Sequence, residues 1–325
     1  MTDAQANLPT ILPAYDDLPE GPIGGRLGWH VFGPDDQLGL VNLLTPARVA
    51  KAARLITRGE VFPLDHPFGS FEPPLNPKRH NPEHHVLQSS PLSFDDYYDN
   101  AYPQAGSQWD SFAHVGYRPG VFYNGVTTEQ ILAGEANGFE HVAAHGIAGR
   151  AVIFDMPKVF ESLGRDYDPG GTVEFEEDAL QAAAEHAGIT HETGDIIVLY
   201  TGFEEWYAAQ DQATRDALPD QHKTPGIGHT EATARYLWDI HATAIVSDNY
   251  AVEAWPANRD PENNPFGFIH QMLIGSFGML LGELWHLSDL VADCRESGVY
   301  EGMLVSAPMR QAGSIGSTAS SVIIK

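Results

Sequence analysis

Polar side chains that could do chemistry are densest in the segment QAGSQWDSFAH, residues 104–114. Gln104, Gln108, Asp110 and His114 are separated by even numbers of residues, so in an extended segment they project to the same side. Two amide oxygens, a carboxylate and an imidazole could ligate a hard or borderline metal ion and supply a base. The alternative interpretation is a polar turn with a solvent-facing histidine.

A second candidate pair is His270 with Glu283, and both are embedded in apolar sequence, FGFIHQMLI and GMLLGELW. A buried carboxylate needs a partner, because an unpaired one carries a large desolvation cost. A metal ion or a protonated histidine would serve. Alternatively, His270 and Glu283 satisfy each other or nearby backbone groups.

Two further segments could contribute to a ligand site. SDNYAVE, residues 247–253, follows a predicted buried strand, and the ends of strands in α/β folds commonly bind ligands. Asp248 and Asn249 are the candidates there, although an Asx-turn explains them equally well. In the histidine-rich segment KRHNPEHHVLQ, His85 is the best candidate because it begins an apolar stretch.

The elements that must position these residues alternate between helices and short apolar strands. The pattern predicts helices over 45–59, 175–188, 229–240 and 288–298, and strands over 151–154, 195–202, 242–249, 302–306 and 319–325. It predicts a long loop over 60–107, and an apolar helix with a glycine-containing turn over 266–283. This alternation indicates an α/β fold with a central sheet covered by helices. Residues 1–30 are expected to form an extended arm, and 31–325 a single domain.

Composition excludes several classes of function. The 325 residues include 18 basic and 44 acidic side chains, a net charge of −26, which disfavours nucleic-acid and anionic-membrane partners. The single cysteine, Cys294, allows neither an intrachain disulfide nor a thiolate zinc site. No GxGxxG, GxxxxGK[ST] or GxSxG motif occurs. The sequence shows no signal peptide and no long apolar run, so we expect a cytoplasmic protein.

Several stretches together resemble the cyclase family of metal-dependent hydrolases, which includes bacterial kynurenine formamidase and isatin hydrolase. They are FGPDDQLGLVNLLTP, GSQWDSFAHV, HGIAGRAVIFD, GDIIVLYTG, IVSDNYAVE, HQMLIGSFGMLLGE and GSIGS, and they cover most of residues 30–325. The resemblance implies an α/β fold of the swivelling β/β/α type, built around a central mixed sheet flanked by helices. It also implies a homodimer or homotetramer.

The central motif of this family is HxGTHxDxPxH, and the chain resembles a branch with a QWDxxxH form. Laid on this sequence, its positions are Gln104, Gly106, Ser107, Gln108, Asp110, Phe112 and His114. In the family, the first two histidines and the aspartate bind a divalent metal, and the last histidine acts as acid or base. A later pair that completes a second metal position matches His270 and Glu283.

Two imidazole ligands of the family are therefore carboxamides here, at Gln104 and Gln108. A neutral amide oxygen is a weaker zinc ligand than imidazole and suits a harder ion such as Mn²⁺. The resemblance then implies one divalent metal, Mn²⁺ or Zn²⁺, held by Asp110, His270 and Glu283, with Gln108 completing the set. The two glutamines also leave open that no metal binds.

The expected function is metal-dependent hydrolysis of an amide, imide, formamide or lactone bond in a small cyclic or aromatic substrate. His114 would act as acid or base, with Gln108 and Ser107 hydrogen-bonding beside it. The expected substrate contacts are Gln104, Trp109, Phe112, Tyr123, His85, Asp248 and Asn249. The alternatives are a metal-free acid/base lyase, isomerase or cyclase that uses the same pocket, and an inactive member that only binds a small molecule.

Overall fold

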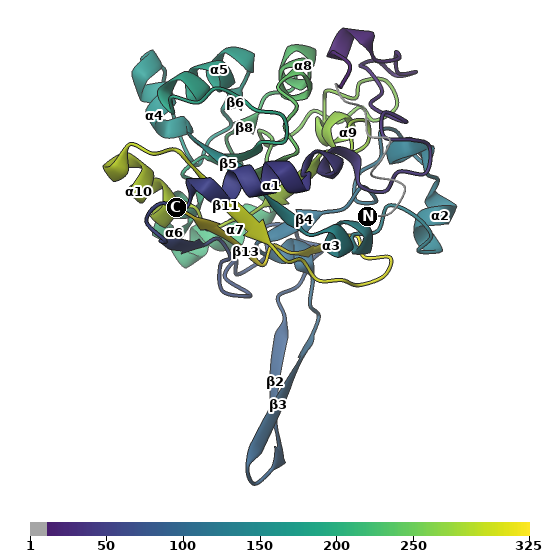
Figure 1. Cartoon of the computed structure of the whole chain (residues 1–325). Helices are drawn as coiled ribbons and strands as arrows, with labels where there is room; N and C mark the ends of the chain where they lie inside the picture. Colours follow the sequence, from purple (N-terminus) through teal and green to yellow (C-terminus); the bar gives the residue numbers. More distant parts are fainter. Residues whose placement is uncertain (1–11) are drawn as a thin grey trace.

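A nine-stranded mixed sheet forms the centre of the molecule, in a computed structural model that describes residues 12–325 (Figure 1). The strand order is β1-β13-β11-β5-β7-β9-β10-β4-β12. Strands β5, β7, β9 and β10 run parallel, and the remaining pairings are antiparallel. The bounds are β1 Val61–Pro63, β4 Gln108–Asp110, β5 Ile147–Asp155, β7 Ile196–Tyr200, β9 Ala244–Ser247, β10 Leu280–Glu283, β11 Glu301–Ser306, β12 Gly316–Thr318 and β13 Ser321–Ile324.

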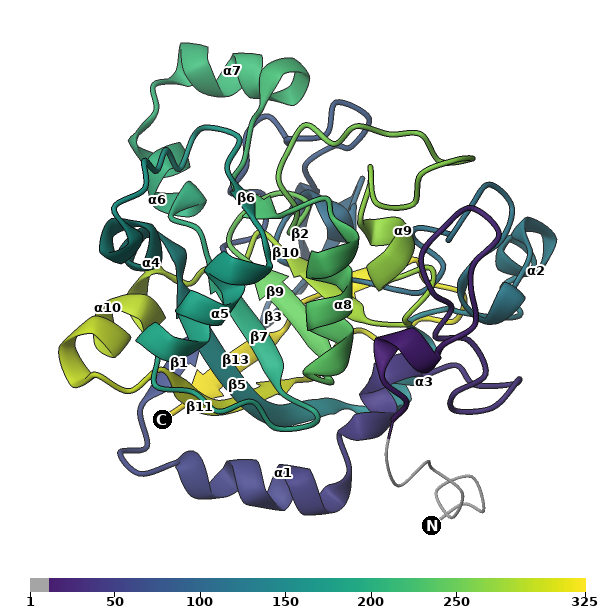
Figure 2. The ribbon, with the colours of Figure 1, turned by 90° about the horizontal axis from the view of Figure 1, so that it is seen from above.

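Helices cover this sheet, and Figure 2 shows α5 and α8 side by side over its parallel strands. The bounds are α1 Pro46–Ala52, α2 Thr128–Leu132, α3 Glu140–His145, α4 Met156–Leu163, α5 Glu177–His186, α6 Phe203–Ala209, α7 Gln212–Gln221, α8 Glu231–Asp239, α9 His270–Leu273 and α10 Ser288–Ser297. A small parallel pair, β6 Glu174–Phe175 and β8 Gly226–Ile227, lies outside the main sheet. The predicted α/β fold with a central mixed sheet flanked by helices is confirmed.

The parallel strands were predictable because both of their faces are buried. Every residue of β7 and β9 is buried, so each strand appears in the sequence as a short continuous apolar run. The prediction for 266–283 was wrong in part, since α9 covers only four residues there and β10 follows it. A fully buried strand and a buried helical segment give the same apolar run, which periodicity cannot separate.

The long loop predicted over 60–107 is wrong for residues 61–63, which form β1, and for residues 83–99. Strands β2 (Glu83–Ser90) and β3 (Ser93–Asp99) pair antiparallel into a ribbon that projects from the body (Figure 1). Because no face of the ribbon is buried against the body, its sequence lacks apolar alternation. His85 lies on this ribbon, stacked on Tyr97 and paired with Asp99 at 3.2 Å.

The described part of the expected arm, residues 12–30, packs on the body. The indole N–H of Trp238 donates to the carbonyl of Pro13 (2.9 Å), and the Tyr15 amide donates to Asp239 (2.7 Å). Residues 1–11 of that expected arm lie outside the described residues. Among the described helices, none combines the length and the apolar character that crossing a bilayer requires.

Candidate active site

Strand β4 places two predicted site residues on one face of the sheet. It lies between β10 and β12, with Gln108 directly opposite Glu283. Side chains alternate along a strand, so Gln108 and Asp110 share a face and Trp109 points to the other. The expected extended segment is limited to these three residues: Gln104 lies in a 3₁₀ turn, and a turn after Asp110 returns His114 to within 3.6 Å of its carboxylate.

The side chains of Asp110, His270 and Glu283 meet in a buried cluster. Each offers one metal-ligand atom, and these atoms lie within 4.8 Å of one another. The His270 Nε2 atom lies 3.4 Å from Glu283 Oε1, and the Gln108 amide nitrogen donates to Glu283 Oε2 at 2.9 Å. Within residues 12–325, neither carboxylate oxygen of Asp110 has a hydrogen-bond partner, nor does Gln108 Oε1. An unpaired buried carboxylate costs several kcal/mol, so this donor set fits a divalent cation.

The charges in the cluster are strongly coupled. Burial, together with the charge of Glu283, raises the pKa of Asp110 well above its usual range. Burial alone would lower the pKa of His270, but the charges of Glu253 and Glu283 outweigh it and raise the pKa to about 10. Burial would raise the pKa of Glu283, yet the hydrogen bond and charge of His270 hold it below its usual value. Without a cation, His270 is therefore an imidazolium at neutral pH.

Glu253 fixes the orientation of His270. Its fully buried carboxylate accepts from His270 Nδ1, from the backbone N–H of Ile269 (3.1 Å) and from His229 Nε2 (2.7 Å). His229 in turn contacts Glu174 through Nδ1 at 3.1 Å. Because Nδ1 of His270 is held by Glu253, Nε2 faces the cluster, an arrangement that orients metal-binding histidines in proteins. Sequence reasoning singled out the segment SDNYAVE but not Glu253, although a lone acid in an apolar stretch was the available signal.

The cluster opens into a cavity of about 220 Å³. His114, His270 and Glu283 line it together with Asn76, Arg79, Val115, Tyr250, Ala251, Trp255, Arg259 and Phe268. The Arg259 guanidinium lies over the rings of Trp255 (4.8 Å) and Phe268 (4.2 Å). The Phe268 ring stacks on the His270 imidazole at 4.7 Å. Aromatic side chains and two arginines, all from loops, therefore form the cavity walls. The spacing of the motif residues did not indicate these walls, although Arg79 belongs to the histidine-rich segment.

His114 is suited to accept a proton. Its side chain is 23 % exposed and lines the cavity. Burial and the nearby positive charge of His270 outweigh the charge of Glu283, and its pKa falls to about 4. The imidazole is therefore neutral at physiological pH, the protonation state that a general base requires.

Three predicted aromatic contacts lie in the core and not at the cavity. Trp109 is fully buried on the opposite face of β4, where its indole N–H donates to Ser306 Oγ at 3.0 Å. Phe112 packs on Tyr123, with ring centroids 5.1 Å apart, and the Tyr123 hydroxyl donates to Asp36 at 3.0 Å. Trp109 points into the core because side chains alternate along a strand, and the neighbour of Asp110 on β4 therefore lies on the opposite face of the sheet.

Other predicted residues are also held away from the cavity lining. The Ser107 hydroxyl donates to the Leu284 carbonyl (2.6 Å) and accepts from the His66 amide (2.8 Å). Asp248 accepts from the backbone amides of Thr201 (2.6 Å) and Glu204 (3.2 Å).

The Asn249 side chain donates to the carbonyl of Pro225. The Gln104 carbonyl accepts from Arg79, so Gln104 contacts a cavity residue through its backbone. His85 remains on the projecting ribbon, as described above. The structure thus brings together Gln108, Asp110, His114, His270 and Glu283.

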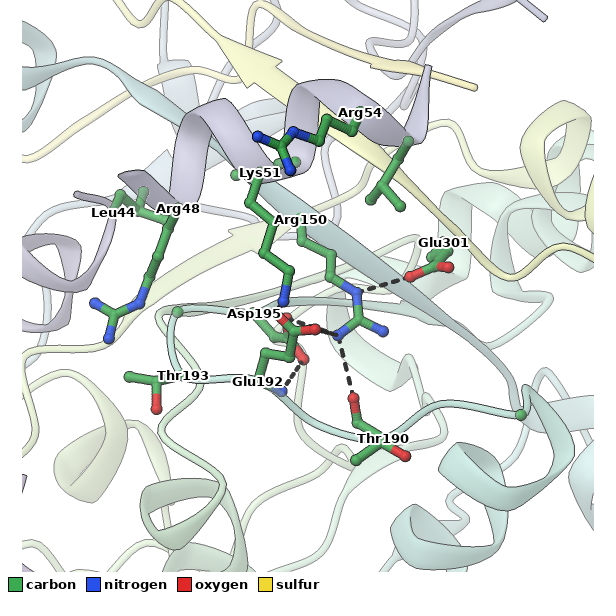
Figure 3. Close-up of a pocket in the computed structure, with 15 residues that line it drawn as sticks. Leu44, Arg48, Lys51, Arg54, Arg150, Thr190, Glu192, Thr193, Asp195 and Glu301 are labelled. Atoms are coloured by element: carbon green, nitrogen blue, oxygen red, sulfur yellow. Dashed lines mark hydrogen bonds and ion pairs between the residues drawn. The ribbon is translucent and has the colours of Figure 1, made fainter. Parts of the chain in front are cut away.

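A separate pocket of about 460 Å³ lies between α1 and the segment before β7 (Figure 3). Two of its four basic side chains, Lys51 and Arg150, are paired with acidic ones. Arg150 Nε donates to Glu301 at 2.8 Å, and Lys51 Nζ lies 2.5 Å from Glu192. The pocket contains no residue of the Asp110 cluster, so its size does not make it the site of the predicted chemistry.

Comparisons with known proteins agree with this geometry. A family model described as "Putative cyclase" matches residues 62–254, more than half of the chain. A crystal structure described as a novel cyclase is 29 % identical, covers 97 % of this chain and 100 % of its own, and superposes with a TM-score of 0.79. A comparison with curated proteins found no match.

Two isatin hydrolases share the fold at lower identity. Isatin hydrolase A from Labrenzia aggregata, bound to benzyl benzoate, is 12 % identical over 87 % of this chain and 98 % of its own, with a TM-score of 0.57. Isatin hydrolase A from Ralstonia solanacearum is 15 % identical over 86 % and 95 %, with the same TM-score. The match of the family model over most of the sheet and the cluster residue Asp110 shows that this chain belongs to the cyclase family.

Proposed function

We propose that this chain is a metal-dependent hydrolase that cleaves an amide, imide, formamide or lactone bond in a small cyclic or aromatic substrate. The observation that carries the proposal is the carboxylate of Asp110, fully buried and without a hydrogen-bond partner among the described residues, beside His270 and Glu283. His114, neutral at physiological pH, adjoins this cluster and lines the same cavity.

Asp110, His270 and Glu283 would hold the metal, and two carboxylates with one imidazole suit Mn²⁺ or Zn²⁺. A bound divalent ion would supply Lewis-acid activation of water or of the scissile carbonyl. Gln108 has one amide oxygen without a partner in the described structure, which could join this ligand set. Glu253 would keep Nε2 of His270 directed at the cluster by holding Nδ1.

His114 would accept a proton at its free imidazole nitrogen from the attacking water and pass it to the leaving nitrogen or oxygen. The cavity supports the substrate class. About 220 Å³ is below the usual range for drug-sized ligands, so the substrate is small. Trp255 and Phe268 contribute apolar lining, while Arg79 and Arg259 can bind carbonyl or carboxylate oxygens. The fold shared with isatin hydrolases makes cyclic amides the first compounds to assay.

The test is turnover of a panel of cyclic amides, cyclic imides, lactones and N-formyl arylamines by protein loaded with Mn²⁺ or Zn²⁺. We expect Asp110→Asn to lose both the metal and the activity, and His114→Ala to lose activity while keeping the metal. Asp95→Asn, on the exposed ribbon, is the matched control. Full activity of the wild-type protein after chelation would favour metal-free acid/base chemistry, and ligand binding without any turnover would favour a binding protein.

We also propose a homodimer or homotetramer. Large apolar side chains exposed on the ribbon support a protein surface there: Val86, Leu87, Leu92, Phe94, Tyr97 and Tyr98. An isolated two-stranded ribbon is only marginally stable in water, so contact with a second copy would stabilise it. Light scattering of the full chain, and of a variant in which a short turn replaces residues 84–98, tests this. A monomeric full chain would contradict it.

A further inference from the structure

A second cluster of metal-ligating side chains lies outside the cavity. It consists of His66, which follows β1, Glu204 in the first turn of α6, and His286, which follows β10. Glu204 Oε2 lies 3.2 Å from His66 Nε2 and 2.8 Å from His286 Nδ1. One ligand atom from each residue lies within 4.8 Å of the others, and the cluster shares no residue with the Asp110 cluster.

His286 and Glu204 both have hydrogen-bond partners behind their proposed ligand atoms, as metal ligands in proteins usually do. The other nitrogen of His286, Nε2, contacts the Asp289 carboxylate at 3.3 Å. Glu204 Oε1 accepts the backbone amides of Leu287 (2.7 Å) and Ser288, which leaves Oε2 directed at the imidazoles. A carboxylate behind a histidine, and hydrogen bonds behind a ligating carboxylate, are recurrent features around protein metal ions.

The His66 nitrogen provides an independent observation. His66 Nε2 is buried and has no hydrogen-bond partner within the described structure, although Glu204 Oε2 lies only 3.2 Å away. The two atoms are close without being aligned for a hydrogen bond. A nitrogen and a carboxylate oxygen that bind the same metal ion likewise lie close together without a hydrogen bond between them.

The charge balance of the site also favours a cation. Glu204 is only 5 % exposed, and its backbone amide donates to Asp248, which is fully buried. Among residues 12–325, neither carboxylate forms an ion pair with lysine or arginine. Two adjacent buried carboxylates need positive charge nearby, which two imidazoles and a divalent ion would supply.

We propose that His66, Glu204 and His286 form a second divalent metal site of the zinc type, separate from the Asp110 cluster. Two imidazoles and one carboxylate are a usual protein ligand set for zinc. The His66 and His286 side chains are 18 % and 31 % exposed, so a fourth position is open to water. The inference does not rest on the hydrolase activity proposed above.

The site would hold the backbone next to the active strand. The His66 amide donates to Ser107 Oγ, and Ser107 donates to the carbonyl of Leu284, two residues before His286. Ser107, the residue before β4, therefore joins the chain segments of two of the ligands. A metal that joins His66 to His286 would therefore join the segments that hold Ser107. We assign Ser107 a positioning role through these bonds.

The experiment measures metal alone, without substrate. Protein stripped by a chelator is equilibrated with Zn²⁺, desalted and analysed by elemental mass spectrometry. We expect about two equivalents in the wild type and about one in each of Asp110→Asn and His286→Asn, with none in the double variant. His84→Asn, on the exposed ribbon, is the matched control and should keep two. In the Asp110→Asn background, Asp289→Asn should lower the Zn²⁺ affinity of the remaining site by about 10–100-fold, as measured by calorimetry.

The outcomes separate this site from the proposed active site. Metal that is lost in Asp110→Asn and fully retained in His286→Asn overturns the second site, and it means that the three side chains form only a hydrogen-bonded network. Metal that is retained in Asp110→Asn and lost in His286→Asn overturns the Asp110 centre instead. Circular dichroism checks folding, and His66→Asn replaces His286→Asn if that variant does not fold.

Discussion

Loading the Asp110 centre with a metal ion should release protons into solution. With a pKa of about 10, the His270 imidazole of the metal-free protein is protonated at pH 7. It must become neutral before Nε2 can bind a cation. The raised pKa of Asp110 acts in the same direction, because its carboxyl group must also lose its proton before it binds a cation. His114, with a pKa of about 4, contributes none.

We therefore expect at least one proton to be released per ion at pH 7. Each proton released makes the apparent affinity rise about tenfold per pH unit, which is about 1.4 kcal/mol, so we expect a slope of log K against pH of at least one. Because the charge of Glu253 is the largest influence that raises the pKa of His270, Glu253→Gln should reduce the number of protons released.

The assay is calorimetric titration of Mn²⁺ into apoprotein at pH 7, in buffers with different heats of ionisation. The His286→Asn background removes the second proposed site from the signal. His114→Ala is the control and should leave the proton number unchanged. Tight binding with an affinity that does not change between pH 6 and 8, and with no protons released, would refute the assignment of His270 and Asp110 as ligands.

Three further predictions concern activity and stability. His114→Ala should lower kcat by about 10²–10⁴-fold with metal content unchanged; steady-state rates and elemental analysis check this, and an unchanged kcat contradicts the assigned role. Arg259→Ala should raise KM for substrates that carry a carboxylate more than for neutral ones, because its guanidinium lines the cavity, and equal effects on both would count against it. Asp155→Asn should lower the free energy of unfolding by about 1–3 kcal/mol, because Asp155 is buried and accepts two hydrogen bonds from Arg295 at 2.7 and 2.9 Å. Urea unfolding checks this, and an unchanged midpoint would show that the pair contributes little.

The cluster residues could be predicted from the sequence because they are polar or charged residues within apolar segments. Asp110, His270 and Glu283 are polar groups in apolar or strand-forming sequence, and burial makes such groups seek one another or a cation. The substrate-wall residues were not predictable in the same way. Trp255, Arg259 and Phe268 come from a segment whose rings and charges meet only through tertiary packing.

The cluster of His66, Glu204 and His286 could not be predicted from the sequence either. His66, Glu204 and His286 follow three different strands and have no common motif, so no local spacing connects them. They meet because β7 and β10 run parallel and end at the same edge of the sheet, while the bridge between Asp65 and Trp285 brings His66 to that edge. Local patterns predicted β7, but periodicity did not distinguish β10, and the bridge has no sequence signature.

The position of β4 inside the sheet also determines when during synthesis the active site can form. Both of its neighbours, β10 and β12, come from the last fifth of the chain, and the hydrogen bond from Gln108 to Glu283 spans 175 residues. A ribosome must therefore release residues up to Thr318 before β4 has both partners. Contacts of such long sequence separation form late and slowly in folding. Asp110 stays without its cluster partners on any incomplete chain that ends before β10, so metal uptake at the proposed centre would mark a chain that extends at least through β10.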